Sequence, residues 1–145
     1  MKAATSRKLP IAAGKAWEIA GRFNGLAEIS RVTAKSELID GGRIRRLTGT
    51  SGGVLLERLK HFDDDARTLS YEIIEVHNAQ LAYGKGYRGR VRIRDDVPGQ
   101  SCVWEYEAEF EPAPGVTEGA AQRAVEEFVQ DCIDGACRLL GLTGS

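Results

Sequence analysis

The chain has 145 residues, 42% of them hydrophobic and 28% charged, and a formal net charge of −1 at pH 7. This length predicts a single domain, residues 1–145, with one core. The nearly balanced charge argues against a protein that binds nucleic acid or an anionic membrane mainly by electrostatic attraction, and no apolar run is long enough to span a membrane.

The first part of the chain is predicted to contain one strand, two short helices and then a series of strands. Lys2–Leu9 is a weak strand candidate, and Lys15–Phe23 and Leu26–Ser30 are expected to be helical. Both helices are too short to be stable alone, so we expect them to pack on a sheet. Segments bounded by turn residues follow, and they are predicted to form antiparallel strands: Val32–Ile39, Arg43–Thr48, Val54–Phe62 and Thr68–Val76.

The clearest strand signal lies in the next two segments. In Tyr87–Arg94 arginines alternate with mainly apolar residues, and in Cys102–Glu111 glutamates alternate with mainly aromatic and small residues. This period of two predicts that each strand has one buried face and one exposed face. If the strands pair, the arginine row lies beside the glutamate row, which indicates a solvated set of ion pairs and not a phosphate-binding stripe.

The last predicted element is a long amphipathic helix, Thr117–Gly141. One face carries polar side chains that include Gln130, Asp131 and Asp134. The apolar face covers about half of the circumference, more than the roughly 100° that a surface helix needs. It consists of Ala121, Ala124, Val125, Phe128, Val129, Cys132, Ile133, Ala136, Leu139 and Leu140. Thr117 can cap the helix and Gly141 can end it in a left-handed turn, and so broad an apolar face is expected to lie in a concave surface.

The two ends and the cysteines add three expectations. Met1–Pro10 contains basic residues but no apolar block after them, so it is not expected to be a secretory signal. Cys102, Cys132 and Cys137 match neither a disulfide framework nor a zinc-binding spacing. We therefore predict a cytoplasmic protein without a metal site, in which the cysteines act as small hydrophobic residues.

Four groups of residues, taken in order, suggest a family. They are Ile11-Ala12-Ala13 with Trp17, Phe23 and Leu26; Gly42–Leu47; Glu57-Arg58-Leu59 with the residues up to Glu75; and Tyr87–Pro112. Their order and spacing resemble the polyketide cyclase/dehydrase branch of the START-like helix-grip superfamily. The resemblance implies an α+β fold, in which a curved antiparallel sheet of six to seven strands wraps around the C-terminal helix beside two short helices.

The resemblance does not imply one reaction, because the superfamily includes cyclases, lipid carriers, hormone receptors and condensing enzymes. Three departures are visible. Ala13 stands where the family usually has proline, a tryptophan common after the second short helix is replaced near Ile29, and the loop His77–Gly86 is longer than usual. In related receptors this loop forms a gate over the pocket, so the geometry of the gate is left open here.

Alternation along the strands, supported by the resemblance, predicts which side chains point inward. Most are apolar, as is typical of a small-molecule pocket with a few orienting polar groups. The predicted ligand-binding residues are Leu47, Leu59, His61, Leu69, Ile73, Gly89, Val91, Trp104, Tyr106, Phe128, Val129 and Cys132. Gly89 and Ala108 are expected to leave room for the ligand because their side chains are small or absent.

Arg45, Glu57, Tyr71 and Tyr87 are the candidate catalytic residues. Arg45 and Glu57 are expected to face each other, because a charge on an inward face is costly unless it is paired. They form either a buried structural ion pair or an anchor for a ligand or enolate. Tyr71 and Tyr87 either donate protons or pack with satisfied hydroxyl groups. His61 can act as a general base, but its place at a strand end favours a rim position near solvent.

Two functions follow, and the sequence does not decide between them. The first is a binding or carrier protein that encloses a small hydrophobic or aromatic, polyketide-like molecule between the sheet and the C-terminal helix. The second is a cofactor-independent cyclase, aromatase or dehydratase that acts on an enolisable substrate. An interaction domain without a pocket is a third possibility. We expect no cofactor, no nucleic-acid partner and no membrane insertion, and either a monomer or a homodimer.

Overall fold

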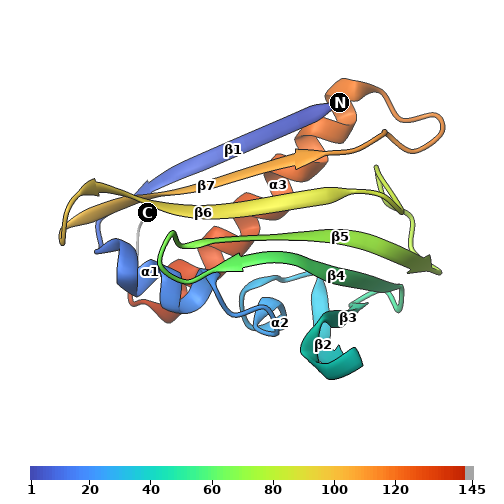
Figure 1. Ribbon diagram of the computed structural model, residues 1–145. Helices are drawn as coiled ribbons and strands as arrows, with labels where there is room; N and C mark the ends of the chain where they lie inside the picture. The colour runs from blue at the N-terminus through green and yellow to red at the C-terminus, as the bar shows by residue number, and fades with distance from the viewer. Residues whose placement is uncertain (143–145) are drawn as a thin grey trace.

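One antiparallel sheet and a long C-terminal helix make up most of the computed structural model, which describes residues 1–142 (Figure 1). The strands are β1 (Lys2–Leu9), β2 (Thr33–Ile39), β3 (Ile44–Gly49), β4 (Val54–Asp63), β5 (Thr68–His77), β6 (Arg88–Val97) and β7 (Ser101–Glu109). The helices are α1 (Ala13–Ala20), α2 (Leu26–Ile29) and α3 (Glu118–Leu139), with a 3-10 turn, η1, at Asp40–Gly42. This arrangement confirms the predicted helix-grip fold, although element ends differ by a few residues.

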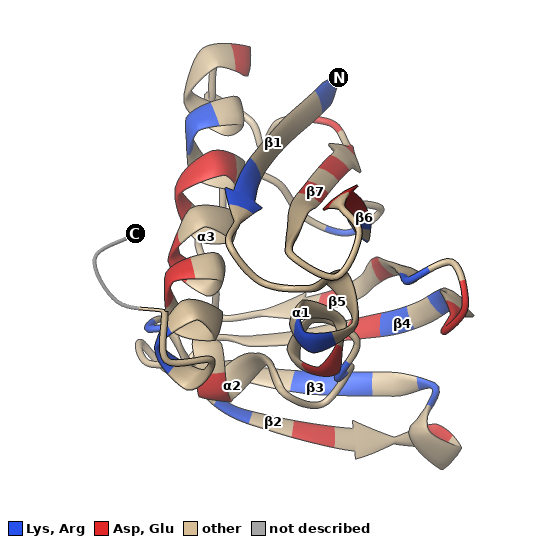
Figure 2. Ribbon diagram, turned by 90° about the vertical axis from the view of Figure 1, so that its left-hand side faces the viewer, with Lys and Arg blue, Asp and Glu red and all other residues tan. Residues whose placement is uncertain are grey.

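The strands follow the order β1-β7-β6-β5-β4-β3-β2, and every neighbouring pair is antiparallel. Strands β2 to β7 form a meander, while β1 crosses over to pair with β7 at one edge. The sheet curls away from this edge, so that β2 and β3 lie far from the upper part of α3 in Figure 2. Its curvature creates the concave side on which the two short helices and α3 lie (Figures 1 and 2).

The predicted C-terminal helix is present, and its apolar face is largely buried. Thr117 caps it, because the threonine hydroxyl accepts a hydrogen bond from the Ala120 amide at 3.1 Å. Leu139 is an exception, since it is 51% exposed where α3 ends. Gly135 is buried although the sequence did not place it on the apolar face, and an added Cβ there would collide with the carbonyl group of Ile29. The glycine therefore allows α2 to approach α3 closely.

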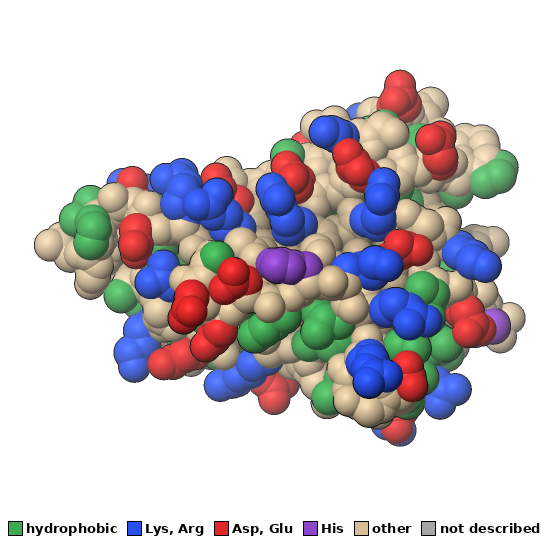
Figure 3. Space-filling view, in the orientation of Figure 1, with side chains coloured by type: hydrophobic (Ala, Val, Ile, Leu, Met, Phe, Trp, Pro, Cys, Tyr) green, Lys and Arg blue, Asp and Glu red, His purple; other side chains and the backbone are tan. Residues whose placement is uncertain are grey.

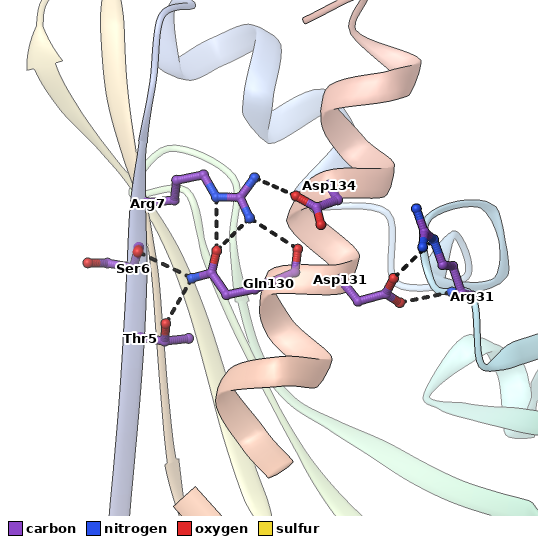
Figure 4. A network of polar contacts seen from close by, with 7 residues as sticks. All are labelled: Thr5, Ser6, Arg7, Arg31, Gln130, Asp131 and Asp134. Carbon is purple, nitrogen blue, oxygen red and sulfur yellow. Dashed lines mark hydrogen bonds and ion pairs between the residues drawn. The ribbon is translucent and has the colours of Figure 1, made fainter. Parts of the chain in front are cut away.

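The polar side of α3 is tied to β1. Gln130 accepts hydrogen bonds from Arg7 at 2.9 and 2.6 Å and donates one to Thr5 at 2.8 Å (Figure 4). Arg7 also forms an ion pair with Asp134 at 2.8 Å. Asp131 accepts a hydrogen bond from the Arg31 amide at 2.9 Å, which joins the helix to the segment after α2. These contacts hold α3 at the β1 end of the sheet and leave the opposite end of the concave face for a pocket.

The outer face of the sheet carries the predicted rows of charges. Arginine and glutamate side chains on β6 and β7 form ion pairs between directly opposed residues at 3.1 Å (Arg88–Glu109) and 2.7 Å (Arg90–Glu107), and a diagonal ion pair at 3.4 Å (Arg94–Glu105). Basic and acidic side chains are accordingly interspersed on this face in Figure 3. Each exposed pair contributes less than about 1 kcal/mol, but together they favour one register.

None of the helices formed by residues 1–142 has the length and apolar character needed to cross a membrane. Cys102, Cys132 and Cys137 are free and buried, as expected for cysteines that serve as small hydrophobic residues. Burial raises the pKa of the Cys132 thiol to about 12, and the nearby Asp131 adds to this effect, so the thiol stays protonated.

Candidate ligand-binding site

A pocket of about 610 Å³ lies at the end of the concave face that α3 leaves open. It is bounded by strands β3 to β5, the start of β2, the loop after β5, and the side chains of Leu26 on α2 and Phe128 on α3. Its apolar walls include Leu26, Val32, Leu47, Leu55, Leu81 and Phe128. Its polar lining consists mainly of Glu57, three tyrosines and the hydroxyl and amide side chains near the rim. This is the composition of a small-molecule site.

Two turns meet at the rim of the pocket. An added Cβ at Gly53, in the turn between β3 and β4, would lie 2.8 Å from the Cβ of Ala79 and 2.9 Å from the Asn78 carbonyl oxygen. Only glycine allows this close approach. The loop after β5 is further held by a hydrogen bond of 2.8 Å from the Ala113 amide to the Ala82 carbonyl. The gate region, whose geometry the sequence left open, is therefore fastened on two sides.

Arg45 and Glu57 lie directly opposite each other on β3 and β4. Arg45 donates a hydrogen bond from Nε to Oε1 of Glu57 at 2.8 Å, and a terminal guanidinium nitrogen forms an ion pair with the same oxygen at 2.7 Å. A further bond of 2.9 Å reaches the Phe23 carbonyl oxygen, and the guanidinium lies 4.6 and 4.7 Å from the ring centres of Phe23 and Tyr71. Burial is the largest single influence on the pKa of Arg45 and lowers it, but the charge of Glu57, the hydrogen bond to Glu57 and the nearby Tyr71 and Tyr106 together raise the pKa above its usual value.

The two partners of this ion pair face different spaces. Glu57 lines the large pocket, whereas Arg45 lines a separate space of only about 50 Å³. Both Arg45 bonds end on Oε1, and Oε2 of Glu57 accepts no hydrogen bond within the described range 1–142. The pair therefore presents a carboxylate oxygen to the large pocket and keeps its positive end away from it.

Three tyrosine hydroxyls form a chain behind the pocket. The hydroxyl of Tyr106 is 2.7 Å from that of Tyr71 and 2.5 Å from that of Tyr87. The three groups carry three hydrogens but share only two bonds, so one hydrogen is left to donate elsewhere. Tyr71 and Tyr87 both line the pocket and can present it there. Burial is the main cause that raises the pKa of all three phenols, so they are neutral donors and not phenolates.

Gly89 does not provide room for a ligand, in contrast to the expectation from the sequence. An added Cβ would collide with the hydroxyl of Tyr106 and lie 2.8 Å from that of Tyr71. The space above Gly89 is thus filled by the tyrosine chain. Ala108, its partner on β7, is 2% exposed and belongs to the same packed core.

The other predicted residues divide into three groups. Leu47 and Phe128 line the large pocket together with Glu57, Tyr71 and Tyr87. Side chains around the nearly filled space of about 50 Å³ include Leu69, Val91, Trp104, Tyr106, Val129 and Cys132. Leu59 and Ile73 pack in the core and line neither space. The predicted hollow is therefore real on the β3 to β5 side, but solid core occupies the part nearer to α3.

His61 does not point inward, in contrast to the prediction from strand alternation. The pairing of β4 with β5 shifts between Leu59 and His61, which is a β-bulge at Lys60. After the bulge His61 lies opposite Ser70 and is exposed, outside both spaces. An extra residue in one strand reverses the alternation beyond it, which explains the error. The solvent-exposed position that the sequence favoured for this histidine agrees with the structure.

Several lining residues were missed, and Leu55 and Tyr83 are the two considered in detail. Leu55 lies two residues before Glu57 on the same face of β4, so strand alternation would have found it. Tyr83 lies in the irregular loop, where no periodicity exists, and stacks on Tyr87 with ring centres 4.2 Å apart. The pKa of Tyr83 is raised mainly by burial and then by the charge of Glu57. The aromatic residues flanking the glycines of this loop were the available signal.

Groups of three or more His, Cys, Asp or Glu side chains that could hold a metal ion are absent from the described part of the chain. Lys85, which the sequence placed in the gate loop, is exposed and does not line the large pocket.

Comparisons with known proteins agree with this architecture. Among the solved structures to which the chain is similar is XoxI from Bacillus cereus, with 22% identity, coverage of 95% of this chain and 94% of that one, and a TM-score of 0.85. A putative uncharacterized protein from Bacillus thuringiensis has 24% identity, coverage of 96% of this chain and 98% of that one, and a TM-score of 0.84. A START superfamily protein from Mycobacterium smegmatis has 12% identity, coverage of 98% of this chain and 99% of that one, and a TM-score of 0.75. At these identities the likeness shows the fold. A search of curated proteins finds no significant match.

A family described as polyketide cyclase / dehydrase and lipid transport matches residues 1–140, which is nearly the whole chain. The match covers all the strands and helices that build the pocket. The chain belongs to the polyketide cyclase/dehydrase and lipid transport family.

Proposed function

We propose that the chain is a single domain that binds one small hydrophobic or aromatic molecule in the pocket beneath the gate region. The observation that carries this proposal is the pocket itself. Its volume of about 610 Å³ falls within the range of about 300–1,000 Å³ that is usual for small-molecule sites. Its walls are mainly aliphatic and aromatic, and the few polar groups lie where they can orient a ligand.

Cofactor-free cyclase or dehydratase chemistry is the alternative, and the site supports it less. Arg45 does not line the large pocket, and its bonds to Glu57 and Phe23 would have to break before it could stabilise an enolate there. Tyr71 and Tyr87 have raised pKa values, which make them weak acids at neutral pH. The spare hydrogen of the tyrosine chain favours catalysis only as a fixed donor to a carbonyl oxygen.

Binding of Nile red, a neutral dye that fluoresces more strongly in apolar surroundings, tests the proposal. We expect saturable binding by the wild-type chain. Leu55→Trp places a larger side chain in the pocket from β4 and is expected to weaken binding about tenfold, a difference of about 1.4 kcal/mol. Leu38→Trp on β2 is the matched control, because Leu38 is 46% exposed and lies outside the pocket.

Circular dichroism would establish that both variants are folded. Equal Nile red affinities of folded Leu55→Trp and wild-type protein would contradict binding in this pocket, as would the absence of saturable binding by the wild type.

A further inference from the structure

We propose that the pocket selects neutral ligands that carry an O–H or N–H donor and discriminates against anions such as carboxylates and sulfonates. This inference rests on the proposed binding function and names the chemical class of its ligand. It follows from the way the buried ion pair is oriented, which the sequence alone left open.

The first step concerns charge. The residues that line the large pocket include one carboxylate, Glu57, and no Lys, Arg or His in the described part of the chain. The nearest buried cation, Arg45, lines the separate small space and is held between the rings of Phe23 and Tyr71. A ligand anion would therefore meet the negative end of the ion pair without a cation to balance it, and such a like-charge contact is strongly unfavourable.

The second step concerns hydrogen bonding. Glu57 is 5% exposed, and both contacts from Arg45 end on its Oε1. Its Oε2 accepts no hydrogen bond from residues 1–142 and is not fully enclosed by protein, so it is open to the pocket that Glu57 lines. A carboxylate oxygen in such a pocket is stabilised when it accepts a hydrogen bond. A hydroxyl or N–H group of the ligand can supply the missing donor. A carboxylate or sulfonate ligand offers only acceptors and cannot.

The third step concerns the neighbouring protein donors. The Tyr83 hydroxyl and the spare hydrogen of the tyrosine chain both lie at the pocket wall. They can donate to the lone pairs of the same ligand group that donates to Glu57. A phenol or alcohol satisfies both requirements with one oxygen atom, while its apolar body contacts Leu47, Leu55 and Phe128.

Three compounds with one aromatic body test the selection. Phenylnaphthylamine is neutral and has an N–H donor, benzylnaphthalene has a methylene group in its place, and anilinonaphthalene sulfonate keeps the N–H but adds a negative charge. In isothermal titration calorimetry with the intact chain, phenylnaphthylamine should bind most tightly, benzylnaphthalene less tightly and the sulfonate most weakly. The affinity of the sulfonate should be about tenfold or more below that of phenylnaphthylamine.

Glu57→Gln separates the effect of this carboxylate from the general cost of burying an anion. The variant keeps an acceptor oxygen but removes the charge, so the preference for phenylnaphthylamine over the sulfonate should fall by about tenfold. Glu107→Gln, on the outer face, is the matched control and should keep the wild-type preference.

The proposal is overturned if the sulfonate binds the wild type as tightly as phenylnaphthylamine, if benzylnaphthalene matches phenylnaphthylamine, or if folded Glu57→Gln keeps the full preference. If Glu57→Gln does not fold, the order of the three affinities for the wild-type protein decides whether the proposal stands. Nile red has no N–H or O–H donor and no net charge, so its binding tests only the proposed binding function. If Nile red binds but the three compounds do not follow the expected order of affinity, the ligand class is rejected and the binding function is retained.

Discussion

Removing one partner of the Arg45–Glu57 pair should destabilise the protein far more than removing both. Each side chain is 5% exposed, and the two are joined by contacts of 2.7 and 2.8 Å. A single substitution leaves the other charge buried without a counter-charge, whereas replacement of both by apolar residues leaves neither charge. The variants are Arg45→Ala, Glu57→Ala and the double replacement Arg45→Met with Glu57→Leu.

The expected magnitudes follow from the contacts. Loss of one member of a buried pair costs about 3–5 kcal/mol, and Arg45→Ala also removes the donor to the Phe23 carbonyl, which adds about 1–3 kcal/mol. At about 3 °C for each kcal/mol in a domain of this size, each single variant should melt roughly 10 °C or more below the wild type. The double variant should lie within about 2 kcal/mol of the wild type, because replacing a buried pair by apolar residues is often neutral.

Urea unfolding of the four proteins provides the free energies. A double variant that loses as much stability as the two single variants together would show that the side chains act independently, and it would refute the structural role of the pair. Single variants that keep wild-type stability but lose Nile red binding would instead assign the pair to ligand recognition alone.

Two further predictions concern the tyrosine chain. Gly89→Ala should lower the free energy of unfolding by about 1–3 kcal/mol, because the added Cβ collides with the hydroxyls of Tyr71 and Tyr106. Gly84→Ala, in open space in the gate loop, is the control and should change this free energy by less than about 1 kcal/mol. Thermal melting compares the two variants, and equal melting temperatures would contradict the packing around Gly89. The pKa values of all four tyrosines are raised mainly by burial, so the stability that depends on their neutral forms is present below the unfolded pKa of about 10 and is lost above it. Spectrophotometric titration should detect tyrosinate only when the chain unfolds in alkali, and a gradual ionisation in the folded protein would disagree.

Regular periodicity explains what could be predicted from the sequence. In β6 and β7 the period of two fixes which side chains share a face, so the ion-pair rows were predictable without coordinates. Alternation likewise assigned Arg45 and Glu57 to inward faces, and the cost of an unpaired buried charge indicated that they face each other. The capped helix α3 followed from its repeat of apolar residues and from Thr117.

The predictions failed where the backbone is not periodic and where the volume of neighbouring side chains determines whether a cavity exists. The bulge at Lys60 breaks the alternation of β4, and no local signal marked it, so His61 was assigned to the wrong face. Gly89 has no side chain, but whether it leaves a hollow depends on Tyr71 and Tyr106, which reach over it from β5 and β7. Tyr83 lies in a loop, whose position is set by contacts to Gly53 and Ala113 that are distant in sequence.

The position of the pocket depends on polar residues of α3 that the helical pattern placed on the solvent side. Gln130 and Asp134 bind Arg7 of β1, so the helix is fastened to the β1 edge by contacts on the side opposite to its apolar face. Asp131 binds Arg31 and ties the helix to the segment after α2. Side chains from β6 and β7 fill the space next to α3 almost completely, leaving about 50 Å³ there against about 610 Å³ at the other end. An amphipathic pattern identifies the buried side of a helix but not the strand that it lies beside. The position of the pocket is for this reason a property of the assembled fold and depends on the polar contacts between α3 and β1.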